Sequence, residues 1–492
     1  MNRKKHWGIG FLGILSATAL LMGSCGKEKD LDPNPPITGE VTNADINRWV
    51  LDSMKVYYYW TDFIPANPNL NAAPPQFFES ILKRPDDRFS WIQNNEDLRN
   101  QLSGVIKTSG LGLGWFLVGA NNAGAAVRFV HKGSPADLAG IKRGDLFIKV
   151  NGAYFTANGN QITNADPIFG NETFTLTRGI LNEGVISAGS DVTLTPVENF
   201  QETAILLDTV LTTPNNTKVG YLFYNRFLSN QAQQLVNAFG RFKSAGITEL
   251  IIDERYNSGG GINVAGVLSG MIHKNFNVNA PYILYNFNQR LGGTIPLTYG
   301  DVFGAANGPV VSNNNLGLDR VFILATGSSA SASELLINNL RPFMGASNVV
   351  HIGSPTRGKD DASITISNSD TSRFKGENDW GIQPIILKYA NRDGEGNFVD
   401  GLIPAHQVSE SIPYAPMGSE EDPLIGKALS IIDPSIQALY NRRMSIQRQR
   451  ALPFDMQRFE EFNVEQTRPI PLDVTETLKD RKAGESHQLH LK

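Results

Sequence analysis

Residues 321–363 hold the side chains best suited to covalent chemistry. A serine cluster, GSSASASE (327–334), follows an apolar run, and Lys359 ends the later stretch GSPTRGK (353–359). A serine hydroxyl becomes a nucleophile when a neighbouring base takes its proton, and a neutral lysine amine can be that base. Ser331 lies between two alanines, so a substrate backbone can approach it closely. These residue types point to acyl transfer by a serine–lysine pair.

Two strands and a helix have to bring the pair together. The apolar runs Val321–Ala325 and Val349–Ile352 predict buried strands, and a helical pattern opens at Glu334. At the helix start, Ser331 would meet free N–H groups and a partial positive charge. An amine acts as a base at neutral pH only if its pKa falls from about 10.4 to about 7. Burial can supply such a shift, and Arg357 would push the same way.

The same stretch also matches the spacing of a phosphate loop. Residues 353–359 satisfy G-x-x-x-x-G-K, but Asp360 stands where a magnesium-binding Ser or Thr is needed. Residues 362–366 then alternate like a strand, whereas a phosphate loop requires a helix N-terminus. The glycines at 259–261 also fail the dinucleotide fingerprint, because Val264 replaces its third glycine. The sequence therefore disfavours nucleotide binding.

A serine–histidine hydrolase is the remaining alternative. His351 lies on a segment from which it could reach Ser331. However, a histidine inside the strand-like Val-Val-His-Ile run is typical of a structural residue, and the chain has no G-x-S-x-G elbow. The serine–lysine hypothesis is favoured, and the histidine stays open as an alternative.

The composition is that of an ordinary globular protein. The chain has 492 residues, 41% of them hydrophobic and 19% charged, and a formal net charge of −4. This length suits two or three domains, and no basic patch indicates a nucleic-acid partner. With one cysteine, no intramolecular disulfide can form. We expect no metal or cofactor, because no His/Cys/Asp cluster has ligand spacing.

The single cysteine, Cys25, has a distinctive context. A basic start and the apolar stretch Ile9–Met22 precede it, which is the layout of a secretory signal. Met22-Gly-Ser-Cys25 resembles the bacterial lipoprotein cleavage box, in which the cysteine is lipidated. The resemblance implies a signal peptide (1–24), a tether (25–40) and a lipid-anchored protein of the cell envelope, at the outer membrane, periplasmic or surface-exposed. A plain signal peptide remains the alternative.

The rest of the chain divides by pattern into four parts. Residues 41–107 predict an N-terminal helical domain, with Asn43 or Asp45 as helix N-cap, and residues 198–415 alternate strand and helix as an α/β core does. Within the core, residues 273–317 predict a hairpin excursion and 382–388 a strand. We assign no chemical role to residues 416–492.

Residues 108–197 resemble a PDZ domain of the bacterial protease type. The resemblance is carried by HKGSPADLAGIKRGDLFIKVNG (131–152) and by a glycine-rich turn ahead of a strand. It implies that the turn, made of Leu111, Gly112, Leu113 and Gly114, offers backbone N–H groups to a peptide C-terminal carboxylate. The peptide would then add as a strand to the sheet edge.

Three motifs in order, DERYNSGGG (253–261), GSSASASE and GSPTRGK, resemble those of the carboxyl-terminal processing, or tail-specific, serine proteases. The resemblance implies an α/β, multidomain α+β protein whose mixed α/β catalytic domain is of the ClpP/crotonase-like type. It also implies site residues: the nucleophile Ser331, the base Lys359, and an oxyanion hole made by the N–H groups of Gly259, Gly260 and Ala332.

The chain departs from that family at the group that orients the lysine. Many members have Gln four residues after the lysine, where Ser363 stands here, and Ser354 and Arg357 also differ. Glu334 matches an acidic residue that some members use, so it either joins the catalytic group or only caps the helix.

Together these features predict an exported, lipid-anchored serine endopeptidase that captures polypeptide C-termini. Its partners would be those C-termini and, through the lipid, the membrane; no oligomeric state is indicated. The alternative is a catalytically impaired, PDZ-containing surface lipoprotein that binds peptides.

Overall fold

The computed structural model describes residues 41–118, 121–158, 161–367 and 379–450. The predicted signal peptide, the tether and Cys25 lie outside the described residues, as does the end of the predicted C-terminal extension. Within the described ranges, no helix is both long enough and apolar enough to cross a membrane.

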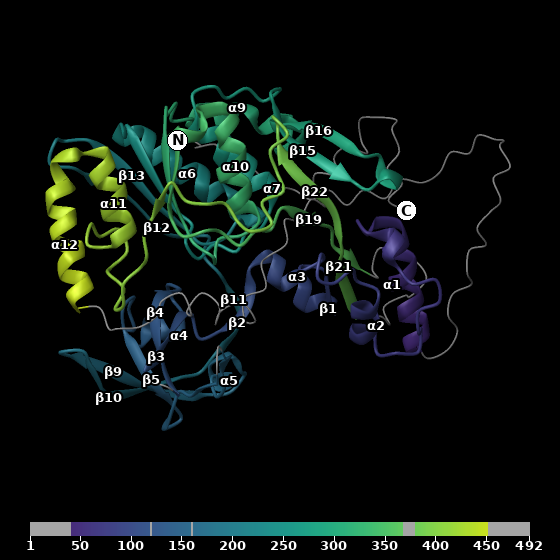
Figure 1. The fold of residues 1–492 in the computed structure, drawn as a ribbon, viewed down its shortest axis with the longest axis horizontal. Helices are drawn as coiled ribbons and strands as arrows, with labels where there is room; N and C mark the ends of the chain where they lie inside the picture. Colours follow the sequence, from purple (N-terminus) through teal and green to yellow (C-terminus); the bar gives the residue numbers. More distant parts are fainter. Residues whose placement is uncertain (1–40, 119–120, 159–160, 368–378, 451–492) are drawn as a thin grey trace, which may run out of the picture.

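A six-stranded sheet forms the centre of the α/β core (Figure 1). Five neighbouring strands run parallel, and the sixth, β12, pairs antiparallel with β13. In spatial order they are β12 (Ile205–Thr212), β13 (Lys218–Tyr224), β14 (Glu249–Asp253), β17 (Val321–Ala325), β18 (Val349–Gly353) and β23 (His406–Gln407). The run predicted at 321–325 is a strand with those bounds, because both of its faces are buried.

Helices cover both faces of this sheet. Alternate strand residues point to opposite sides, so Ile252 packs in one core and Ile251 in the other. The first core holds α6 (Ala232–Ala245), α7 (Ile262–Ile272) and α10 (Ala332–Met344), and the second holds α11 (Pro423–Ile432), which α12 (Gln437–Arg450) follows. The start of the predicted C-terminal extension therefore packs as part of the α/β core.

A second sheet contains the strand that follows Lys359 in the chain. Its strands, in order, are β16 (Thr294–Thr298), β15 (Pro281–Phe287), β22 (Ile385–Asn391) and β19 (Asp361–Ser363). The excursion predicted at 273–317 contains the β15–β16 hairpin with α8 (Tyr299–Phe303) and α9 (Gly308–Asn314). The single strand predicted at 382–388 is wrong: β21 (Trp380–Gln383) and β22 are separated at Pro384, which has no N–H to donate.

The N-terminal helices pack beside this region (Figure 1). They are α1 (Asn43–Tyr57), α2 (Pro74–Ser80) and α3 (Asn95–Ser103). The N-cap of α1 is Thr42 and not Asn43 or Asp45; Asp45 instead closes a capping box with it. Strand β1 (Trp91–Asn94) pairs with β21, which also pairs with β20 (Ile366–Ser367). The N-terminal domain is thus joined to the catalytic chain by a shared sheet.

Residues 108–197 form a separate β-rich body below the catalytic domain in Figure 1. Its base is a strand pair, β2 (Val105–Thr108) with β11 (Val197–Gln201). Its sheet has the order β10 (Val185–Leu194), β9 (Phe174–Asn182), β5 (Leu146–Val150), β4 (Asn122–Val130), β3 (Leu111–Val118), with β6 (Ala153–Tyr154) on β5. Short elements complete it: α4 (Pro135–Leu138), β7 (Ala157–Asn158), β8 (Gln161–Ile162) and α5 (Asp166–Phe169).

Candidate active site

Ser331 sits at a strained turn between β17 and α10. Its backbone has φ 61° and ψ −111°, in a region that L side chains rarely occupy. Strain of this kind persists only where the surroundings enforce it, and it clusters at functional sites. A serine on a strained strand-to-helix turn is the arrangement of a nucleophile elbow. The geometry is present although the sequence lacks the G-x-S-x-G motif.

Two other serines of the cluster have structural roles. Ser329 Oγ donates to the Glu254 carbonyl at 2.7 Å, and Ser333 Oγ donates to the Asn257 carbonyl at 3.0 Å. These bonds fasten the turn to the DERYNSGGG segment. Ser331 Oγ, in contrast, is buried and has no hydrogen-bond partner among the described residues. Among these three serines, only Ser331 keeps a hydroxyl free for chemistry.

Glu334 ties the serine turn to the lysine loop. Its carboxylate accepts the backbone N–H of Ser331 at 2.8 Å, of Gly358 at 2.6 Å and of Lys359 at 2.8 Å. It also accepts the Thr356 hydroxyl at 2.6 Å. Burial raises the pKa of Glu334 above its ordinary value, against the lowering effect of these bonds. Of the two roles that the sequence left open, Glu334 fills more than a helix cap, because it holds two loops.

The Lys359 amine is buried and meets Asp361. Nζ forms an ion pair with the Asp361 carboxylate and lies 3.2 Å from the Asp361 carbonyl. It also lies 4.6 Å from the centre of the Phe89 ring. No hydrogen bond joins it to Ser331 Oγ in the described structure. The two backbones are nevertheless adjacent, since the Tyr389 hydroxyl lies 3.2 Å from the Ser331 carbonyl oxygen and 2.9 Å from that of Lys359.

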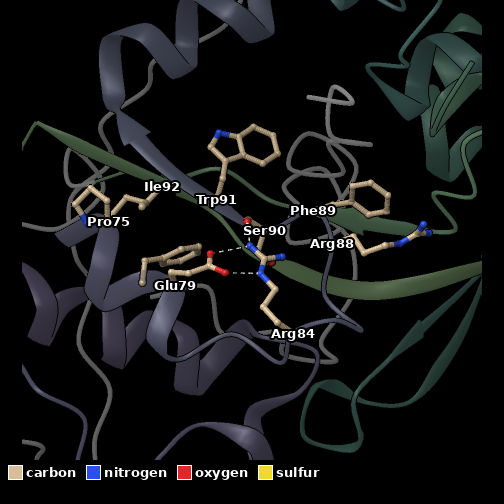
Figure 2. A pocket seen from close by; sticks show the side chains of 9 residues that line it. Pro75, Glu79, Arg84, Arg88, Phe89, Ser90, Trp91 and Ile92 are labelled. Carbon is tan, nitrogen blue, oxygen red and sulfur yellow. Dashed lines mark hydrogen bonds and ion pairs between the residues drawn. The ribbon is translucent and has the colours of Figure 1, made fainter. Parts of the chain in front are cut away.

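The N-terminal domain covers the lysine. Arg88 donates to the carbonyl of Gly358 and, at 3.1 Å, to that of Val399, while Phe89 lies against the amine. A cavity of about 270 Å³ lies next to Arg88 and Phe89 and is lined by residues of the N-terminal domain. Figure 2 shows the Arg84 guanidinium held by Glu79 within it, with Arg88 and Phe89 to the right of that pair. No motif in the sequence indicates that Arg88 and Phe89 cover the lysine loop.

The predicted oxyanion glycines lie beside the serine. A Cβ on Gly259 would stand 2.7 Å from the Ser331 Cβ and 3.2 Å from the Ala332 nitrogen. Gly259 and Gly260 have φ of 111° and 139°, which favour glycine. The Gly259 N–H is already donated to Asn257 Oδ1 at 2.9 Å. The Gly260 N–H has no partner among the described residues, so it is the available donor of the glycine pair.

A buried charge network supports the turn that carries these glycines. Arg255 forms ion pairs with Asp253, Glu410 and Asp422, and Arg143, from the 108–197 body, reaches the same Glu410 and Asp422. Burial alone would raise the pKa of Asp422, but the two arginines hold it below its ordinary value. The second domain is therefore linked by charge to the base of the active-site turn.

The alternative site residues lie elsewhere. His351 is buried in β18 with Nε2 3.3 Å from the Ala325 carbonyl oxygen, and burial lowers its pKa to about 4. No hydrogen bond joins it to Ser331 within the described chain. The segment after Lys359 enters strand β19 and not a helix, so the geometry of a phosphate loop is absent there.

The predicted peptide-binding turn is a strand. Leu111, Gly112, Leu113 and Gly114 belong to β3 and pair with β4, and the turn is made earlier, at Gly110, whose φ is 91°. β3 is the last strand on its side of the sheet among the described residues. Its outer edge thus has no strand partner within the described ranges.

Several groups around the pair were not identified from the sequence. Asp361, Phe89, Asn257, Thr356 and Tyr389 all contact the serine turn, the glycine turn or the lysine loop. Only Asp361 had a usable signal. It lies two residues after the lysine and directly before the stretch 362–366, which alternates like a strand; an extended chain from the lysine onward would put both side chains on one face.

Comparison with known proteins gives consistent matches. Residues 45–91 match the model of the peptidase S41 N-terminal domain, and residues 218–408 match peptidase family S41. The carboxy-terminal processing protease CtpA of Bacillus subtilis is 24% identical over 410 residues, which are 83% of this chain and 78% of that protein.

One of the matched solved structures is similar in fold. A Bacteroides fragilis protein assigned to the S41 proteases, at 24% identity, superimposes with a TM-score of 0.64 over 78% of this chain and 97% of that one. The photosystem II D1 C-terminal processing protease matches at 17% identity, with a TM-score of 0.45 over 75% and 94% of the two chains. Residues 45–91 and 218–408 thus match the two segments of an S41 serine peptidase, and the Bacillus relative is a peptidase as well.

Proposed function

We propose that the protein is an endopeptidase that recognises polypeptide C-termini and cleaves with Ser331 as nucleophile and Lys359 as base. The observation that carries this proposal is the Ser331 hydroxyl, which is buried, lacks a partner and sits on a strained turn beside Gly259. A buried polar group without a partner is costly, and retaining one at such a turn is consistent with a chemical role.

Each residue has a defined part in the reaction. Ser331 Oγ attacks the scissile carbonyl as its proton passes to the neutral Lys359 amine. The developing oxyanion accepts the N–H groups of Gly260 and Ala332, each worth about 3–4 kcal/mol. Lys359 then gives the proton to the leaving amine, and water hydrolyses the acyl-enzyme. The amine has to turn from its present position toward Ser331, as catalytic hydrogen bonds often tighten only with substrate bound.

Residues 108–197 are proposed to act as a PDZ domain that captures the substrate C-terminus. Strand β3 ends its sheet, and an extended peptide can add to such an edge through main-chain hydrogen bonds. The name of the Bacillus relative describes carboxy-terminal processing, which agrees with this substrate class. Arg143 connects this domain to Glu410 and Asp422 below the active-site turn.

Cys25 is proposed to carry a lipid that anchors the enzyme in the cell envelope. The support is the sequence before the cysteine. Metabolic labelling with a fatty-acid analogue tests it: the wild-type chain should incorporate label and fractionate with membranes, and Cys25→Ser should do neither. Equal labelling of both would remove the anchor from the proposal.

Cleavage is tested with an unfolded protein that bears an apolar C-terminus. The wild-type enzyme should release peptides, and Ser331→Ala and Lys359→Ala should not. The same substrate with acidic residues at its C-terminus should be cut more slowly, through a higher KM. Equal release by all three enzymes would indicate a contaminant. Binding without cleavage by the wild-type chain would favour the peptide-binding module.

A further inference from the structure

We propose that Asp361 is the positioning residue of the catalytic lysine: it orients the Lys359 amine and stabilises the ammonium that forms when Ser331 loses its proton. The proposal rests on the proposed Ser331–Lys359 pair. It assigns a role to a side chain that neither the sequence motifs nor the family resemblance singles out.

The contacts of the amine carry this assignment. Among the described residues, Asp361 is the one carboxylate paired with Lys359 Nζ, and the Asp361 carbonyl oxygen lies 3.2 Å from the same nitrogen. Lys359 is fully buried and Asp361 nearly so. The Phe89 ring covers the pair on one side. Because the amine is buried, it cannot turn to a hydrogen-bond partner in the solvent. The orientation of the Lys359 side chain therefore depends on Asp361.

The other candidates for this role are already engaged. Both carboxylate oxygens of Glu334 accept two hydrogen bonds each, from three backbone N–H groups and one hydroxyl. Ser363, at the position where many relatives have glutamine, donates its hydroxyl to Gln383 Oε1 at 2.7 Å. Neither side chain contacts the amine within the described structure. The residue paired with the lysine is therefore Asp361, two positions after it, whereas many relatives have a glutamine four positions after it.

Strand geometry explains why Asp361 can take this place. Asp361 opens β19, and side chains two apart in an extended chain point to the same side. The Lys359 amine meets the Asp361 carboxylate, so these two side chains lie on one side, and Asp360 between them lies on another. Asp360 pairs with Lys388 of β22 at 2.6 Å. The two neighbouring aspartates therefore serve two different lysines.

The charges that face Asp361 set how it responds to pH. Lys359 and Lys388 favour its ionised form, Asp360 opposes it, and Tyr389 and Glu334 lie on neighbouring elements of the same cluster. Burial has the largest effect and raises the pKa of Asp361. The role of a base requires that the Lys359 amine is neutral when it accepts the proton. The Ser331 O–H bond then breaks, the new N–H bond makes an ammonium, and the adjacent carboxylate stabilises it. The proton finally moves to the leaving nitrogen.

The test compares Asp361→Asn with Asp360→Asn in the full chain. Asparagine is similar in shape to aspartate but has no charge, and Asp360 is the matched control because it is adjacent, buried and paired with a different lysine. Rates are measured against pH with a quenched fluorescent peptide. We expect Asp361→Asn to lower kcat at least about tenfold with KM within about twofold. This loss is below the about 10²–10⁴-fold that a positioned base contributes.

The pH profile separates a catalytic effect from a structural one. Loss of the carboxylate makes the ammonium easier to deprotonate, so the rising limb of kcat against pH should move to lower pH by about one unit or more. Asp360→Asn should leave the midpoint close to the wild-type value, because Asp360 is paired with Lys388 and does not contact the Lys359 amine. Asp361→Glu retains the charge and should also keep it, with partial activity. This variant decides the question if Asp361→Asn does not fold: a folded Asp361→Glu with a displaced midpoint overturns the proposal.

Failure of the proposal differs from failure of the proposed function. If Asp361→Asn is folded and keeps the wild-type midpoint and kcat, Asp361 is not the partner, while Ser331→Ala and Lys359→Ala can still be inactive. If Lys359→Ala is as active as the wild type, the serine–lysine pair itself is wrong, and the role of Asp361 falls with it.

Discussion

The backbones of Ser331 and Lys359 are joined through a single atom. Glu334 Oε2 accepts the N–H of each residue at 2.8 Å. The serine turn and the lysine loop are therefore fixed relative to one another, although their side chains are not hydrogen-bonded.

Glu334→Gln should weaken both the fold and the reaction. The amide replaces one acceptor oxygen with a donor, which leaves at least one buried N–H without a partner. The cost is about 1–3 kcal/mol per unpaired group, and we expect kcat to fall because the two loops are no longer held together. Urea unfolding and peptide cleavage measure the two effects. Glu249→Gln, which removes only the half-buried pair with Arg320, is the control. A Glu334→Gln enzyme with wild-type stability would contradict the role of Glu334.

Substitutions in the serine cluster should separate chemistry from structure. Ser331→Ala removes a hydroxyl without a partner, so stability should be unchanged or slightly higher while cleavage is lost. Ser329→Ala should lower stability by about 1–3 kcal/mol, because the Thr326 N–H and the Glu254 carbonyl both lose a partner. Thermal unfolding and cleavage rates of the two variants test this contrast. The assignment of the nucleophile fails if Ser331→Ala retains activity.

Gly259→Ala should inactivate the enzyme through the nucleophile. The added methyl would stand 2.7 Å from the Ser331 Cβ, and the φ of 111° is unfavourable for alanine. Displacing a reacting group by about 1 Å can cost 10²-fold in rate, so we expect a loss of that order in kcat. Gly246→Ala is the control, since its φ of 67° is also positive but a methyl there meets no atom within 4 Å. Equal kcat in both variants would exclude a steric effect on Ser331.

The core of the fold could be predicted because local and tertiary demands agree there. Val321–Ala325 is an apolar run buried on both faces of a parallel sheet, so hydrophobicity alone defines its bounds. The turn at Leu111–Gly114 was predicted wrongly because side chains of neighbouring segments lie close to its glycines. A Cβ on Gly114 would stand 2.7 Å from Arg128 Nε. Glycine there reflects packing on a strand and not a loop.

The site was predictable in its motifs but not in its charge pairs. Ser331, Gly259 and Ala332 could be chosen by resemblance, and the structure places them together. The partner of Lys359 could not be predicted. The distance between its amine and a carboxylate depends on the path of the chain from the lysine loop into β19. The cover by Phe89 depends on a contact across 270 positions of sequence, which no local pattern encodes.

The Glu254 carboxyl should make the free energy of unfolding depend on pH, and Glu254→Gln should remove this dependence. Its carboxyl is fully buried, and neither oxygen has a partner among the described residues. Burial, with the neighbouring Asp253, raises its pKa well above 4.5. The folded state therefore keeps a proton that the unfolded state releases. The contribution of this group to stability is complete below about pH 4.5 and is lost as the pH rises.

Glu254→Gln is neutral at every pH, so its stability relative to the wild type should rise with pH above about 4.5. The expected slope is about 1.4 kcal/mol per unit until the folded carboxyl ionises. Urea unfolding at pH 4.5, 6 and 7.5 measures this slope. Any fixed cost of burying the amide shifts all three values equally and leaves the slope unchanged. A constant difference between the two proteins across this range would mean that the Glu254 carboxylate is ionised in the folded state and has a partner there.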